Sequence, residues 1–267
     1  FAGSFNSVRH RQLMLKHIGS QISDLLFLVK TNAPLWFIFR HFAVHIGHRL
    51  SSRRREFIVK RDAFRKTKDS LKLSNDWFTI HIPTWLRAFE ECEIETDQTL
   101  ECLEIGSWQG LSAFFILDYF QNARLTCVDT WEGADEHKVD SQTLSTVEQF
   151  FDANLKIHNS RAKKYRGTSL SFVSENFEPN KFDFIYVDGS HHADDVIVDV
   201  TKCFEMLKVG GLLIMDDYLW NYYKEPMDNP AGAINCFLRM KRKYLKVICS
   251  DYQLAIRKVS MPERLVD

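Results

Sequence analysis

Residues 104–112, Glu-Ile-Gly-Ser-Trp-Gln-Gly-Leu-Ser, decide the fold of this chain. They end the apolar run 99–105, which is typical of a buried strand, and precede a helical pattern over 111–120. Glycines at 106 and 110 allow a tight turn between the two, so the stretch predicts a strand, a turn and a helix whose N-terminus faces a ligand. A dinucleotide fingerprint needs a third glycine, in the pattern G-x-G-x-x-G, which this turn lacks.

Strand and helix patterns alternate on either side of this turn. Apolar runs predict strands over residues 99–105, 124–128, 164–166, 182–187, 212–215, 245–249 and 253–258. Helical patterns cover residues 111–120, 142–157, 194–207 and 231–244. Such alternation predicts an α/β fold with a mostly parallel sheet covered on both faces. The last two strands are too close in sequence for a crossover, so we expect them to pair antiparallel.

The charge of the chain is balanced overall but not along its length. It has 267 residues with 35 Lys plus Arg and 35 Asp plus Glu, yet residues 1–75 carry an excess of 11 positive charges. We therefore expect two parts, a basic helical extension over 1–75 and a main domain over 76–267.

Helical stripes over residues 12–29 and 35–46 indicate that the extension packs on the main domain or on a second copy of the chain, so a homo-oligomer is expected. Contact of this basic, aromatic segment with a membrane surface is a second possibility. A nucleic-acid arm is less consistent with the apolar stripes, and no nucleic-acid partner is expected.

Composition excludes several classes of protein. Hydrophobic residues make up 45% of the chain, which excludes disorder throughout. The six cysteines form no C-x-x-C pair, which favours reduced thiols and a cytoplasmic location over a disulfide scaffold. The most apolar stretch, residues 25–46, is interrupted by charged residues and a proline, so no membrane span is predicted.

Acidic residues follow several strands at the edge where α/β sheets bind ligands. Asp129 ends the second strand and could accept both hydroxyls of a ribose, or simply form a turn. Asp188 and the pair Asp216-Asp217 end strands that we expect to be neighbours, about 4.8 Å apart. Carboxylates that close need a shared proton or a cation, and oxygen ligands favour Mg²⁺. The alternative is that these acidic residues lie at the sheet edge without binding a metal.

Four motifs together resemble the class I S-adenosylmethionine (SAM)-dependent methyltransferases. They are LEIGSWQGLSA (103–113), TCVDTWEG (126–133), FDFIYVDGSHHADDV (182–196) and LKVGGLLIMDDY (207–218). Within that class, DGSHH followed by DDY is most similar to the metal-dependent O-methyltransferases of the macrocin and mycinamicin sugar type. The resemblance implies a Rossmann-like, seven-stranded sheet whose last strand is antiparallel, with SAM as cofactor and an Mg²⁺ site.

The resemblance also implies roles for individual residues. SAM would contact Gly106, Ser107, Gly110, Asp129, Trp131, Ser169 and Asp188. Within this set, the glycine turn would hold the methionine part, Asp129 the ribose, and Trp131 and Ser169 the adenine. The metal ligands would be Asp188, Asp216 and Asp217, and His191 would be the general base.

The expected function is transfer of a methyl group from SAM to a hydroxyl of a small molecule, such as a sugar or another natural product, with help from a divalent metal. Two alternatives stay open. One is an NAD-linked oxidoreductase on a similar fold, and the other is a non-catalytic SAM-binding module whose N-terminal arm contacts a membrane or a partner.

Overall fold

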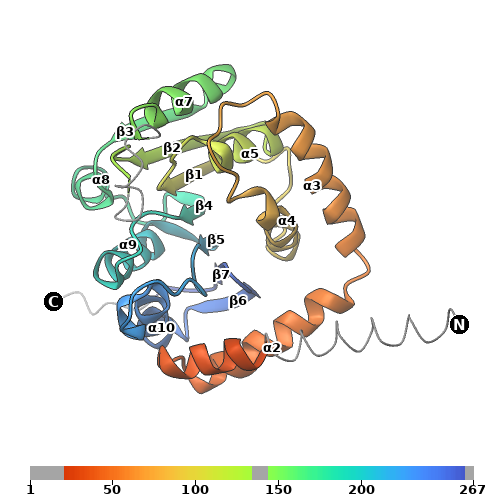
Figure 1. Cartoon of the computed structure of the whole chain (residues 1–267), viewed down its shortest axis with the longest axis vertical. Coiled ribbons are helices and arrows are strands. Elements are labelled where there is room, and N and C mark those ends of the chain that lie inside the picture. The colour runs from red at the N-terminus through yellow and green to blue at the C-terminus, as the bar shows by residue number, and fades with distance from the viewer. Residues whose placement is uncertain (1–20, 134–143, 262–267) are drawn as a thin grey trace, which may run out of the picture.

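The computed structural model of the protein describes residues 21–133 and 144–261 and is built around one seven-stranded sheet (Figure 1). The strands are β1 (Leu100–Ile105), β2 (Ala123–Asp129), β3 (Ala162–Arg166), β4 (Phe182–Val187), β5 (Leu207–Met215), β6 (Leu245–Ser250) and β7 (Leu254–Lys258). Their order is β3-β2-β1-β4-β5-β7-β6, and β7 runs antiparallel to both of its neighbours. The predicted fold class is therefore confirmed.

Helices cover both faces of this sheet (Figure 1). One core packs under α3 (Arg54–Lys68), α4 (Ile82–Glu91), α5 (Leu111–Tyr119) and α7 (Val147–Asn154). The other packs under α2 (Leu35–Leu50), α8 (Ser169–Asn176), α9 (Ala193–Met206), α10 (Pro230–Lys241) and a helix over residues 21–30. Short 3-10 helices lie at Thr79–His81, Lys156–His158 and Pro226–Asp228.

Two parts of the fold differ from the sequence prediction. Residues 51–75 were predicted only as part of a helical extension and residues 76–98 were given no element, whereas the structure places α3 and α4 in this region. Strand β5 begins at Leu207 rather than at residue 212, so Gly210 and Gly211 lie inside the strand, where the register with β4 shifts. The predicted strand began after these glycines because paired glycines are frequent in turns. Glycines also occur in β-bulges, and only the pairing with a neighbouring strand distinguishes the two.

The described part of the N-terminal extension is helical, as predicted, and packs on the sheet domain. Phe57 and Phe64 of α3 belong to one core, while Leu28 and Phe37 belong to the other. Because these side chains share the cores of the sheet, burial of apolar surface ties the extension to it. The boundary at residue 75 stays a prediction.

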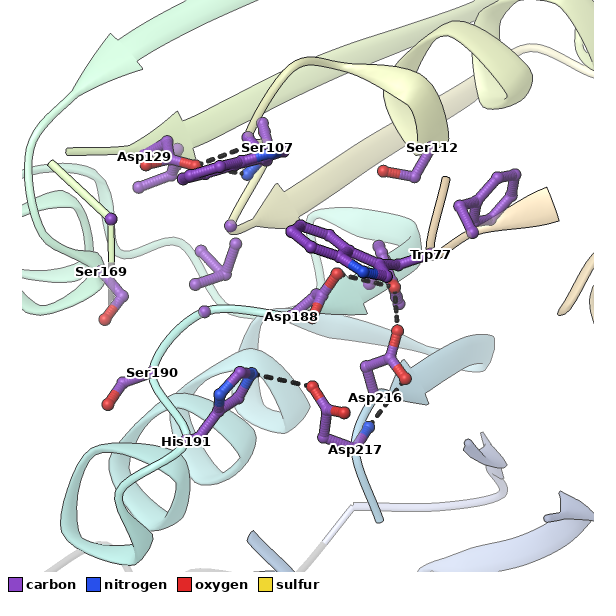
Figure 2. A pocket seen from close by; sticks show the side chains of 18 of the residues that line it. Trp77, Ser107, Ser112, Asp129, Ser169, Asp188, Ser190, His191, Asp216 and Asp217 are labelled. Carbon is purple, nitrogen blue, oxygen red and sulfur yellow. Dashed lines mark hydrogen bonds and ion pairs between the residues drawn. The ribbon is translucent and has the colours of Figure 1, made fainter. Parts of the chain in front are cut away.

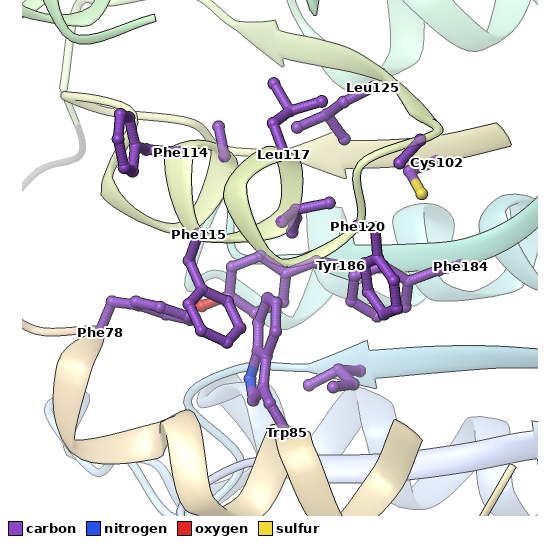
Figure 3. Close-up of a cluster of buried hydrophobic side chains, with 14 of the residues drawn as sticks. Phe78, Trp85, Cys102, Phe114, Phe115, Leu117, Phe120, Leu125, Phe184 and Tyr186 are labelled. Atoms are coloured by element: carbon purple, nitrogen blue, oxygen red, sulfur yellow. The ribbon is translucent and has the colours of Figure 1, made fainter. Parts of the chain in front are cut away.

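The core beneath α4 and α5 is dense in aromatic rings (Figure 3). Trp85 of α4 is fully buried and meets Phe115 and Tyr186 edge to face, with ring centroids 6.1 and 4.7 Å apart. Such pairs add to the gain from burial. They also fix Tyr186, whose hydroxyl extends toward the edge of the sheet described below.

Within the part of the chain that the structure describes, no helix is both long and apolar enough to cross a membrane.

Candidate active site

A cavity of about 1160 Å³ lies at the carboxyl ends of β1, β2, β4 and β5. Its walls come from the glycine turn after β1, the strand-end acids, residues 73–81 before α4, the loop after β5, and the β6–β7 turn. This is the edge at which parallel α/β sheets bind ligands. Of the predicted site residues, Gly106, Ser107, Asp129, Ser169, Asp188, His191, Asp216 and Asp217 line it.

The glycine turn approaches β4 closely. Gly106 has a φ of 85°, and a Cβ there would lie 1.8 Å from the carbonyl oxygen of Asp188. Gly110 has a φ of 80° and would place a Cβ 3.0 Å from the ring of Phe151. Both glycines are therefore required by the backbone path, and the turn leaves the N-terminus of α5 facing the cavity.

Asp129 fastens this turn. Its Oδ2 accepts hydrogen bonds from the backbone N–H groups of Ser107 (2.8 Å) and Trp108 (2.7 Å), and Oδ1 accepts one from Trp131 (2.7 Å). A carboxylate with two oxygens has about four acceptor positions, so room is left for one ligand hydroxyl. The placement suits the predicted ribose contact, which stays a prediction.

Trp131 is not among the residues that line the cavity, and its predicted contact with the adenine stays a prediction. Its side chain is buried, its indole N–H donates to the carbonyl of Trp108 at 2.8 Å, and its ring packs on Phe151. Lys164 lies over the same ring at 4.6 Å. Through these contacts, Trp131 anchors the loop after β2.

Ser169 begins α8 and lines the cavity beside a buried acid that sequence reasoning missed. Asp199 of α9 is only 4% exposed and accepts a hydrogen bond from Ser169. Burial raises the pKa of Asp199 to about 6, and the Ser169 hydrogen bond partly opposes this. An acid in the middle of a helix carries no sequence signal, since its depth depends on how α9 packs.

The three predicted metal ligands come from neighbouring strand ends, as expected (Figure 2). The hydroxyl of Tyr186 lies between Asp188 and Asp216, 2.9 Å from Oδ2 of Asp188 and closer still to Oδ2 of Asp216. Burial and the neighbouring carboxylates raise the pKa of Asp188 and that of Asp216. A tyrosine has one proton to donate, so both contacts are hydrogen bonds only when one carboxyl carries a proton.

Asp217 and His191 form the second half of this cluster. Nε2 of His191 is 2.8 Å from Oδ2 of Asp217, and Trp220 covers the imidazole at a centroid distance of 4.6 Å. Among the described residues, Asp188, His191 and Asp217 can bring ligand atoms within 4.8 Å of one another. Asp216 is not part of this group, because its carboxylate faces Tyr186 and Gln253.

Hydrogen bonds from the aromatic core hold Asp216 in that direction. Trp85 donates to Gln253 at 2.8 Å, and Gln253 donates to Oδ2 of Asp216 at 2.7 Å. The backbone of Asp217 is left-handed, with a φ of 55°, and its N–H donates to Oδ1 of Asp216. Such backbone conformations are costly for residues other than glycine and cluster at functional sites.

Several lining residues escaped sequence reasoning. Tyr186 could have been found, because it lies two residues before Asp188 on one strand and so shares its face. Trp77, His81 and Tyr252 carry no motif, and only the packing of residues 73–81 and of the β6–β7 turn brings them to the cavity. Glu104 is also buried next to the turn, where desolvation raises its pKa to about 7.

The comparisons with known proteins find a similarity to methyltransferases. Residues 103–218 match the family model of a methyltransferase domain. Among solved structures, MycE methyltransferase from the mycinamycin biosynthetic pathway, in complex with Mg and SAH (S-adenosylhomocysteine), is 17% identical over 71% of this chain and 54% of that chain, with a TM-score of 0.49. The O-methyltransferase TomG from Streptomyces achromogenes is 13% identical over 82% and 97%, with a TM-score of 0.47.

This chain spans about half the length of MycE. Among curated proteins, no sequence match was found. The match to the methyltransferase family model covers residues 103–218, less than half of the chain, and shows that this part is similar to methyltransferase domains. The DGSHH and DDY motifs both lie within this matched part. The NAD alternative gains no support, since the matched family is one of methyltransferases.

Proposed function

We propose that this protein transfers the methyl group of SAM to a hydroxyl of a small molecule, assisted by a divalent metal ion. The observation that carries the proposal is one cavity that holds both the glycine turn with Asp129 and the cluster of Asp188, Asp217 and His191. The first set suits a nucleoside cofactor, and the second suits a reacting hydroxyl.

The acidic cluster fits a divalent cation. The carboxylates of Asp188, Asp216 and Asp217 lie at adjacent strand ends, and repulsion between them contributes to the raised pKa of Asp188. A hard cation such as Mg²⁺ prefers oxygen ligands of this kind. Asp188 and Asp217 would hold the ion, with Asp216 beside them. When bound, the ion would lower the pKa of an acceptor hydroxyl.

His191 would accept the proton of that hydroxyl. The Nε2 proton of the resulting imidazolium would be shared with Asp217, which orients the ring and favours its charged form. Trp220 limits the imidazole to one orientation by packing on it. His191 is only 15% exposed at its side chain, so water has little access to the proton in transit.

Aromatic side chains that line the cavity favour a small organic acceptor. Trp77 and Trp108 line it with their rings 6.0 Å apart. Trp220, which packs on His191, also lines it together with Tyr223. Flat apolar surfaces of this kind stack on sugar or aromatic rings.

A reducing compartment such as the cytoplasm suits the protein, because all six cysteines are free.

The direct test is methyl transfer from labelled SAM to a panel of hydroxylated sugars and phenols, with chelator and with added Mg²⁺. We expect methyl ethers to form, chelator to stop the reaction and Mg²⁺ to restore it. Full activity in chelator would remove the metal from the proposal, and transfer only to amines or thiols would remove the hydroxyl acceptor.

Replacing the two adjacent histidines one at a time distinguishes a general base from a residue that only supports the loop. His191→Ala should lower the rate by roughly 10²–10⁴-fold and abolish the limb of the pH profile that reports the base. His192→Ala is the comparison variant, because His192 lines the same cavity and stacks on Tyr223 but does not belong to the group of Asp188, His191 and Asp217. Equal losses in both variants, with unchanged pH profiles, would assign His191 to loop structure instead.

A further inference from the structure

The N-terminal hairpin, formed by the 21–30 helix and α2, carries large apolar side chains on its outer surface. On each helix they recur at helical spacing and form one face. We call this set the hairpin stripe: Ile22, Leu25, Leu26, Val29, Leu35, Phe39 and Ile46. Exposed fractions range from 39% for Leu25 to 76% for Leu35 and Phe39. Apolar side chains gathered in this way mark an interaction surface.

The opposite face of the same helices is already occupied. At 100° per residue, buried Phe37 lies about half a turn from the stripe residues of α2, and buried Leu28 lies about 110° from the centre of the stripe residues on the 21–30 helix. The inner face is fastened by Arg40, which donates to the carbonyl of Val247 at 2.9 Å, and by His41, 2.7 Å from Ser250. The hairpin is thus held firmly by one apolar face, which leaves the second face for another contact.

Charge around the stripe is positive. Asp24 is the only acid between residues 21 and 55, and it faces inward, where burial and Asp251 raise its pKa. Exposed Lys30 lies beside the stripe, and Arg54 and Arg55 begin α3 directly after the hairpin. An apolar face bordered by basic residues complements a surface that is apolar inside and negative at its edge.

We propose that the hairpin stripe docks on an anionic phospholipid surface, with both helices lying in the interface rather than spanning it. A second copy of the chain fits less well, since pairing two such faces would bring like charges together. The hairpin packs on the β6–β7 turn through Ser250, and Tyr252 of that turn lines the cavity. Docking would therefore hold the sheet domain at the lipid surface, with the hairpin between the two.

Vesicle co-sedimentation of the full chain tests this proposal. We expect binding to vesicles of phosphatidylcholine with phosphatidylserine, and little binding to phosphatidylcholine alone. Val29→Glu with Phe39→Glu should weaken the partition by at least about tenfold, because both side chains would enter the apolar layer. Arg54→Glu with Arg55→Glu should weaken it by roughly fivefold or more for each basic residue replaced.

Ile157→Glu is the matched control. Ile157 is 73% exposed, as exposed as Phe39, but follows α7 beside β3, at the other edge of the sheet (Figure 1). The Ile157→Glu variant should bind the vesicles as strongly as the unchanged protein does. Circular dichroism should show that all variants are folded. The proposal is overturned if the stripe variant binds like Ile157→Glu, or if light scattering shows a dimer that the stripe variant converts to a monomer.

Discussion

The backbone of Gly106 passes so close to Asp188 that no side chain fits between them. Gly106→Ala would place its Cβ against a backbone carbonyl at a left-handed φ, which neither rotamer change nor water can relieve. We expect a loss of more than about 2 kcal/mol in the free energy of unfolding and loss of SAH binding. Chemical denaturation and calorimetry measure the two effects.

Gly47→Ala provides the control for that variant. Gly47 lies inside α2, and among the residues that the structure describes a Cβ there would meet just the end of Arg87, at 3.7 Å. Alanine favours a helix over glycine, so stability should stay equal or rise by about 0.5–1 kcal/mol. Equal changes in the free energy of unfolding for the two variants would show that the close approach at Gly106 does not affect stability.

At the scale of an element, α2 depends on a histidine that is buried without charge. His41 is 1% exposed, and burial and His45 lower its pKa to about 4. Below the ordinary pKa of 6.5 the unfolded chain takes up a proton that the folded chain refuses, so stability falls as the pH drops from about 6.5 toward 4. The full loss from this group is on the order of 3 kcal/mol.

Denaturation at several pH values checks this prediction. His41→Phe keeps a ring at the site and should flatten the slope of stability against pH between about 4 and 6.5, despite the lost bond to Ser250. His192→Phe, at an exposed position, should leave the slope unchanged. A slope that survives in His41→Phe would place its origin in other groups.

Elements with a local signature could be predicted, and others could not. Strand β4 and the glycine turn before α5 were predicted, because an apolar run or a pair of glycines is visible in the sequence alone. The individual helices α3 and α4 were not predicted. In α3, most residues are charged or polar, and only Phe57 and Phe64 are buried in the core. Tertiary packing decides where such a helix lies.

The same division applies to the candidate site. Acids that follow strands were placed at the correct edge, since strand direction alone determines it. The sequence could not show that Trp131 turns into the core or that Asp216 faces Gln253. Both outcomes depend on side-chain partners from distant segments, as does the contribution of His81 and Tyr252 to the cavity.

At the scale of the whole molecule, α3 is expected to be part of the core rather than an accessory. The ring of Phe64 is buried against Phe115 at a centroid distance of 5.1 Å. Phe64→Ala should therefore cost about 3–5 kcal/mol in the free energy of unfolding. Val59→Ala, on the exposed side of the same helix, should change it by less than about 0.5 kcal/mol. Equal, small effects would show that the extension is dispensable for the core.

The two halves of the cavity have separate tasks in this account, with cofactor at the glycine turn and metal at the acids. Calorimetric titration of SAH and of Mg²⁺ into the unchanged protein and into Asp217→Asn and Asp129→Ala tests this division. Asp217→Asn should lose Mg²⁺ and keep its affinity for SAH, whereas Asp129→Ala should weaken SAH by about 1–3 kcal/mol. A protein that binds no SAH, or an Asp217→Asn variant that loses SAH as fully as Asp129→Ala does, would contradict it.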